Sequence, residues 1–217
     1  MPQDQLKQSF ERLIAGVRKF HTEVYLPKRA MYEQSVAQPQ QPHTLIITCA
    51  DSRIDPRTIT QTGPGEVFVT RNIGNLVPAY GEMLGGVSAV IEYAVSALQV
   101  SHVVICGHTD CGAMKALMKL EEVESMPTVR AWLRNAEAAL SVAKAKAAQT
   151  GKSDLLAPLI DENVLLQMNH LRTHPSVAGR LATGDLAVHG WVYDIAAGDV
   201  RIYEESRRAF FPVNALV

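Results

Sequence analysis

The chain has 217 residues, of which 47% are hydrophobic and 20% charged, enough for a substantial core and unlike a disordered or fibrous protein. Its 21 basic and 22 acidic residues give a net charge of −1, which argues against nucleic acid or an anionic membrane as the main partner. No secretory signal and no membrane span are expected, because the start is polar and no run of about 18 apolar residues exists. Three cysteines therefore predict free thiols or metal ligands in a cytoplasmic protein.

The N-terminal segment is predicted to be an amphipathic helix. Its apolar residues recur at helical spacing, at Leu6, Phe10, Leu13, Ile14, Val17 and Phe20. We expect residues 1–35 to form a helical arm. A polar loop punctuated by Pro39 and Pro42 should follow over 36–43. No linker or repeat interrupts the rest, so 1–217 is interpreted as one domain that includes this arm.

The body of the chain alternates short apolar runs with helical patterns. Buried parallel strands are expected at 44–48, 67–70 and 103–106, which are rich in β-branched residues. Helical periodicity covers 85–98, 113–123, 127–148 and 155–171, and a hairpin is expected over 186–203. This alternation predicts an α/β fold with a central, mainly parallel sheet flanked by helices.

Candidate metal ligands follow two of the predicted strands. Cys49 comes directly after the first strand, and His108 and Cys111 come after the third. Loops at the carboxyl ends of neighbouring parallel strands form the site crevice of such sheets, so these side chains could meet. Two thiolates and one imidazole suit zinc with an open fourth position, the catalytic pattern. Any one cysteine taken alone would favour a core residue over a ligand, and Cys106, inside the third strand, is interpreted in that way.

Asp51 and Arg53 lie two residues apart, directly after Cys49, and could form a bidentate carboxylate–guanidinium pair. Elsewhere such a pair would be an ordinary salt bridge. Beside zinc, an ionised carboxylate could accept the proton of the solvent nucleophile and orient it. Arg53 would keep Asp51 ionised and turned away from the metal.

With these motifs in place, the sequence resembles the β class of carbonic anhydrases, from about Leu6 to Tyr203. The resemblance rests on C-A-D-S-R-I-D-P (49–56), P-G-E-V-F-V-T-R-N-I-G-N-L-V (64–77), A-V-I-E-Y-A-V (89–95) and G-H-T-D-C-G (107–112). It implies a zinc lyase that hydrates carbon dioxide reversibly to bicarbonate and a proton. The implied roles are one Zn²⁺ per chain on Cys49, His108 and Cys111, with Asp51 and Arg53 as the catalytic dyad.

The resemblance also implies a substrate site and an assembly. Gln40 resembles a glutamine that donates a hydrogen bond to substrate from the neighbouring subunit. A homodimer or a higher even oligomer, such as a tetramer or octamer, is therefore expected. Phe68, Ile73 and Tyr93 resemble residues that line the carbon dioxide pocket, although strand and helix periodicity would equally place them in the core.

One departure from the family concerns regulation. Members inhibited by bicarbonate carry a tryptophan three residues before the first cysteine, where this chain has Ile46. The sequence is thus more similar to the plant-type, non-allosteric branch. Arg71 occurs in both branches and does not separate them.

Two other functions remain open on the sequence. The same zinc site could hydrolyse carbon disulfide or carbonyl sulfide, which pocket width would decide. Alternatively, Asp51 could close the site as a fourth ligand in a non-catalytic zinc module, although Arg53 argues against this. His170 and His174 form H-x-x-x-H but lack the glutamate of a zinc-protease motif, and they are not expected to bind metal.

Overall fold

The computed structural model of the chain describes residues 3–82, 85–151 and 153–215. It consists of two compact units, Met1–Gln40 and Gln41–Val217, which we describe separately. No helix among the described residues is long and apolar enough to cross a membrane.

The first unit is the predicted helical arm. Helix α1 (Gln3–Lys19) continues through a π-helical turn (Phe20–Tyr25) and a 3-10 turn (Leu26–Lys28) into α2 (Arg29–Ala37). The 3-10 turn contains Pro27, which has no N–H to donate to the helical ladder. The loop predicted from residue 36 begins only after Ala37, because α2 extends through Val36 and Ala37. Neither α1 nor α2 buries a residue.

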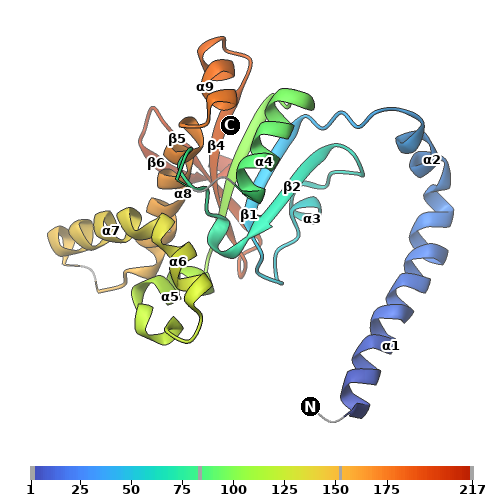
Figure 1. The fold of residues 1–217 in the computed structure, drawn as a ribbon, viewed down its shortest axis with the longest axis horizontal. Helices are drawn as coiled ribbons and strands as arrows, with labels where there is room; N and C mark the ends of the chain where they lie inside the picture. Colours follow the sequence, from blue (N-terminus) through green and yellow to red (C-terminus); the bar gives the residue numbers. More distant parts are fainter. Residues whose placement is uncertain (1–2, 83–84, 152, 216–217) are drawn as a thin grey trace. The chain divides into compact units, whose positions relative to one another are not determined.

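The second unit is built on a six-stranded sheet in the order β2-β1-β3-β4-β5-β6 (Figure 1). The strands are β1 (Thr44–Cys49), β2 (Val67–Asn72), β3 (His102–His108), β4 (Ala187–Asp194), β5 (Asp199–Glu204) and β6 (Ala209–Pro212). The first four strands in chain order pair in parallel. Strands β5 and β6 extend the sheet beyond β4 as antiparallel neighbours. The predicted mainly parallel sheet and the β4–β5 hairpin are confirmed, whereas β6 was not predicted.

Helices connect the strands. They are α3 (Pro56–Thr60), α4 (Gly86–Glu92, continued by a π turn over Tyr93–Ala97), α5 (Gly112–Met118), α6 (Pro127–Leu133), α7 (Glu137–Thr150), α8 (Leu156–Arg172) and α9 (Pro175–Ala182). The single helix predicted over 127–148 is wrong. A 3-10 turn at Arg134–Ala136 divides it, which lets Leu133 and Ala136 both reach the core. Other 3-10 turns lie at Ile73–Asn75, Leu120–Val123 and Val213–Ala215.

The main core lies between the sheet and α8. Leu45 and Ile47 of β1 and Val103 and Ile105 of β3 point to this side and are completely buried. Helix α8 packs closely over β3 and β4, where a Cβ on Gly190 would lie 2.6 Å from the sulfur of Met168. The close packing of helix on sheet therefore requires glycine at that position.

The opposite side of the sheet carries a smaller apolar cluster. Its buried members are Ile46, Val67, Val104 and Cys106. A cavity of about 550 Å³ opens over this side, where Ile46, Val104 and Trp191 contribute to an apolar lining.

Candidate metal centre

The three predicted ligands lie together at the carboxyl ends of β1 and β3. Cys49 ends β1, His108 ends β3, and Cys111 is the N-cap residue of α5. Because β1 and β3 pair directly, the sulfurs and an imidazole nitrogen all lie within 4.8 Å of one another. All three residues are buried.

The imidazole of His108 is oriented for coordination. Its Nδ1 atom lies 2.8 Å from the carbonyl oxygen of Thr109, which can only accept a hydrogen bond, so Nδ1 carries the proton. The Nε2 atom is then unprotonated and carries a free lone pair. It is buried and has no hydrogen-bond partner in the described part of the chain. A buried polar atom normally has a partner, and a metal ion between the two sulfurs would supply it.

The two thiols are electrostatically coupled. A hydrogen bond from the neighbouring Cys111 thiol outweighs burial and lowers the pKa of Cys49 well below its ordinary value. The neighbouring Cys49 sulfur and burial raise the pKa of Cys111 far above its ordinary value. Backbone N–H groups of Ala113 and Met114, in the first turn of α5, oppose that rise. The pair therefore holds one thiolate by itself, and a divalent cation would stabilise the second.

Cys106 is separate from this group, as predicted. It lies in β3 on the other side of the sheet, in the smaller apolar cluster. Burial raises its pKa to about 12, although a hydrogen bond with Thr48 opposes the rise. Cys106 is therefore a neutral core thiol.

Asp51 and Arg53 form the predicted bidentate pair. Arg53 Nη2 lies 2.7 Å from Asp51 Oδ2, and Arg53 Nε lies 2.9 Å from Asp51 Oδ1. The backbone N–H of Arg53 also donates to Oδ1. These bonds from Arg53 hold the pKa of Asp51 far below its usual range, against a smaller opposing effect of burial. The Oδ2 atom lies 4.0 Å from His108 Nε2, beside the ligand group.

Arg53 makes a second contact that the sequence did not reveal. Its Nη1 atom lies 2.9 Å from Asp110 Oδ2, across the two loops that carry the ligands. The other oxygen of Asp110 accepts from the ammonium group of Lys115 in α5. Asp110 has a positive φ of 61°, which aspartate tolerates better than most residues.

The structural role of Arg71 was also missed. It extends from β2 and donates to the carbonyl of Cys49 (3.1 Å from Nε) and to that of Asp51 (2.6 Å from Nη2). The guanidinium therefore fixes the backbone between the first ligand and the dyad. Arg71 lies opposite the end of β1 in the sheet, and this could not be inferred from the sequence before the strand order was known.

The three residues expected to line the substrate pocket are partly brought together. The rings of Phe68 and Tyr93 lie 6.1 Å apart, and Tyr93 is half exposed. Ile73 directly follows Asn72, the β2 residue paired with Cys49, and is 43% exposed. Gln40 belongs to the first unit.

The histidines of the H-x-x-x-H pattern have structural partners. His170 Nδ1 lies 2.8 Å from the carbonyl oxygen of Val77, and His174 Nε2 lies 3.1 Å from that of Pro78. Both rings therefore hold the 77–78 segment against α8 and α9.

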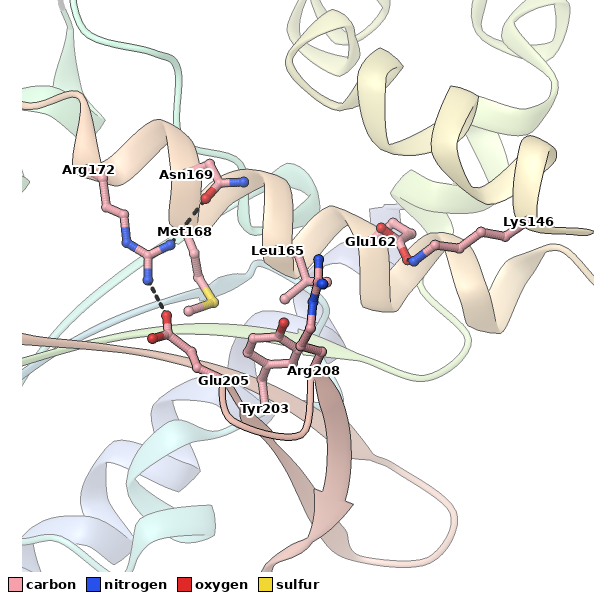
Figure 2. Close-up of a pocket in the computed structure, with 9 residues that line it drawn as sticks. All are labelled: Lys146, Glu162, Leu165, Met168, Asn169, Arg172, Tyr203, Glu205 and Arg208. Atoms are coloured by element: carbon pink, nitrogen blue, oxygen red, sulfur yellow. Dashed lines mark hydrogen bonds and ion pairs between the residues drawn. The ribbon is translucent and has the colours of Figure 1, made fainter.

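A cavity of about 470 Å³ between α8 and the β5–β6 turn is unrelated to this centre. Figure 2 shows Arg172 reaching Glu205 across it and Asn169 on its own helix, α8. Lys146 at its other end pairs with Glu162. Most of its charged groups thus neutralise one another.

Comparisons with known proteins agree with this geometry. The family model described as carbonic anhydrase matches residues 44–200. A carbonic anhydrase of Synechococcus elongatus is 47% identical over 190 residues, which cover 87% of this chain and 70% of that protein.

Solved structures give the same result. The β-carbonic anhydrase CcaA superposes with a TM-score of 0.90 at 39% identity, covering 94% of this chain and 92% of the other. A tetrameric β-carbonic anhydrase of Sordaria macrospora has a TM-score of 0.66 at 28% identity, covering 93% and 97% of the two chains.

Proposed function

The chain belongs to the β-type carbonic anhydrase family, and from this premise we propose how its residues hydrate carbon dioxide reversibly to bicarbonate and a proton. One observation carries the proposal. The buried, unpartnered Nε2 of His108 faces two cysteine sulfurs, beside a carboxylate that an arginine holds ionised.

We propose that Cys49, His108 and Cys111 hold one Zn²⁺ per chain. A bound zinc ion acts as a Lewis acid that lowers the pKa of solvent, so that a nucleophile forms near neutral pH. The soft sulfur ligands and the imidazole nitrogen suit this ion. The Thr109 carbonyl maintains the required tautomer of His108.

Asp51 orients the attacking oxygen. An ionised carboxylate only accepts hydrogen bonds, so it accepts one from that oxygen and thereby directs a lone pair of the oxygen toward carbon dioxide. Arg53 occupies both carboxylate oxygens of Asp51 from the side. That restraint opposes direct coordination by Asp51, which would make the centre non-catalytic.

Substrate binding is assigned to one residue within β2, one directly after β2, one in the turn after α4, and Gln40. Phe68, Ile73 and Tyr93 supply the apolar surface that favours an uncharged gas over water. Gln40 of a neighbouring subunit donates a hydrogen bond to a substrate oxygen as charge develops on it.

This role of Gln40 requires at least a homodimer. The arm presents four large apolar side chains, Leu6, Phe10, Leu13 and Val17, each more than half exposed. Such a surface is typical of a protein–protein contact. We assign it to a second copy of the chain, in a dimer or in a larger even assembly such as a tetramer or octamer.

Two further properties follow from the same residues. All three cysteines are free, and two must stay reduced to act as ligands, which favours the cytoplasm. Ile46 stands where bicarbonate-inhibited relatives have tryptophan, so the non-allosteric branch is proposed.

Stopped-flow measurement of carbon dioxide hydration by zinc-loaded protein tests the function directly. We expect turnover well above that of the zinc-free protein at the same pH. Carbonyl sulfide and carbon disulfide are assayed in parallel. Faster turnover of either compound would identify that compound, and not carbon dioxide, as the substrate. Inactivity on all three with full zinc content would favour a closed, non-catalytic centre.

A further inference from the structure

We infer that Asp110 and Lys115 are positioning residues for the Asp51–Arg53 dyad. The inference rests on the proposed function and adds two residues to its machinery. Neither residue needs to touch substrate. Their proposed effect is transmitted through the guanidinium of Arg53.

The contacts form one chain of alternating charges. Asp51 takes Nε and Nη2 of Arg53, whereas Asp110 takes Nη1 at 2.9 Å. Lys115 then binds the remaining oxygen of Asp110. The two carboxylates bind different nitrogens of Arg53, and Arg53 and Lys115 bind different oxygens of Asp110, so all these contacts exist together; Nη2 also donates to the backbone carbonyl of Asp110 at 3.4 Å.

The geometry shows why the second anchor matters. The Arg53 side chain is 45% exposed, and an exposed ion pair by itself is held weakly because both long side chains remain mobile. With only Asp51 as partner, the guanidinium and carboxylate could swing as a unit. Asp110 binds Nη1, the guanidinium nitrogen that Asp51 leaves free, and so fixes the plane of the guanidinium. Lys115 prevents Asp110 from rotating away.

The network also joins the two loops that carry the metal ligands. Asp51 and Arg53 follow β1, whereas Asp110 lies between the ligands His108 and Cys111. A shift of one loop relative to the other would move the carboxylate relative to the ligand group. Misplacing a reacting group by about 1 Å can cost about 10²-fold in rate.

The test uses Asp110→Asn, because asparagine also tolerates the left-handed backbone at this position, and Lys115→Met, which lies outside the loop. Glu205→Gln is the matched control, since it removes another exposed carboxylate that binds an arginine at 2.6 Å. Carbon dioxide hydration and zinc content are measured for each. We expect about tenfold lower kcat for Asp110→Asn and about threefold for Lys115→Met, with KM and zinc content unchanged. The control should match the wild type.

Two readouts separate positioning from other effects. In the Asp110→Asn background, Lys115→Met should cost nothing further, because Lys115 acts only through Asp110. The NMR rotation rate of the ¹⁵N-labelled Arg53 guanidinium should rise about fivefold in Asp110→Asn and not in Glu205→Gln. This second readout needs no activity, so it stands even if carbon dioxide is not the substrate.

Several outcomes would overturn the inference. Wild-type kcat in Asp110→Asn would do so, as would a slow variant in which Arg53 rotates as in the wild type. Full additivity of the two substitutions would show that Lys115 does not act through Asp110. Loss of zinc from Asp110→Asn would make the residue a support of the ligand loop rather than of the dyad.

Discussion

The Nδ1 atom of His108 lies 2.8 Å from the carbonyl oxygen of Thr109, and this bond fixes which ring nitrogen faces the two cysteines. Thr109 is itself held by its backbone N–H, which donates to the carbonyl of Tyr193 at 2.9 Å. This bond to β4 holds the Thr109 carbonyl in place and so fixes the tautomer of His108, although Thr109 is not itself a predicted metal ligand.

Metal content tests the ligand assignment. We expect about one zinc per purified chain, and less than about a tenth of that in Cys111→Ala, because three protein ligands are the minimum for such a site. Cys106→Ala is the matched control. It removes a buried thiol of the neutral core and should retain zinc. Equal zinc content in the two variants, measured by elemental analysis, would contradict the assignment.

The role of Asp51 is tested by Asp51→Asn. Asparagine keeps the shape but offers an N–H donor and a weaker acceptor, so it cannot hold the proton of the attacking oxygen in the same way. We expect turnover to fall by about 10²-fold or more with zinc retained. Near-normal stopped-flow rates would leave Asp51 with a structural role only.

Supply of Gln40 by a neighbouring subunit predicts complementation between two defective variants. Gln40→Ala and Asp51→Asn should each be weakly active alone. In a mixed dimer, the site with an intact Asp51 receives Gln40 from the partner and is fully restored. Random exchange of subunits between the two variants should therefore recover about a quarter of wild-type activity, because Gln40 and Asp51 act together in one site.

The control for this experiment is each variant mixed with itself under the same exchange conditions. No recovery, despite subunit exchange shown by mass spectrometry, would place Gln40 in the site of its own chain. A fully active monomer in light scattering at assay concentration would contradict the shared site altogether.

The pH–rate profile separates Asp51 from the metal centre. Arg53 holds the pKa of Asp51 far below its usual range, so Asp51 stays ionised at every assay pH and does not shape the profile. Two thiolates neutralise the charge of zinc and weaken its effect on solvent. Activity should therefore rise with pH through about 7–9 and fall as the nucleophile is protonated at lower pH.

Ile46 makes this rise a gradual, one-proton curve. Without the tryptophan of the bicarbonate-inhibited branch, added bicarbonate should not drive Asp51 onto the metal. Profiles measured in the hydration direction, with and without bicarbonate, check this point. A steep multi-proton collapse below pH 8 that bicarbonate deepens would show that Ile46 does not prevent closure.

Arg71 should contribute to stability as well as to the site. Arg71→Met removes two charge-assisted bonds to the carbonyls of Cys49 and Asp51. We expect the free energy of unfolding to fall by about 1–3 kcal/mol and zinc affinity to weaken. Urea unfolding measures the first effect. Arg130→Met serves as control, because Arg130 forms an exposed pair at 3.9 Å with Glu124 and its removal should change stability little.

Much of this protein was determined by local sequence alone. Runs of β-branched residues identified β1, β2 and β3, and helical periodicity identified α1, α4 and α8, because burial on both faces or on one stripe leaves a direct pattern. Cys49 and His108 each end a strand, Cys111 follows three residues after the second of these strands, and Asp51 pairs with Arg53 only two residues away. These relationships are short in sequence or follow from the polarity of a parallel sheet.

Other features were decided only by tertiary structure. The helix breaks at Arg134–Ala136 because core packing, and not local helix propensity, decides the backbone there. The second anchor of Arg53 at Asp110 and the attachment of Arg71 to the loop after β1 depend on strand order and register. Hydrogen bonds between distant residues leave no periodic signal, since each requires only one donor and one acceptor brought together by the fold. The chemistry of the ligands was therefore visible in the sequence, and the means that hold them in place required the folded chain.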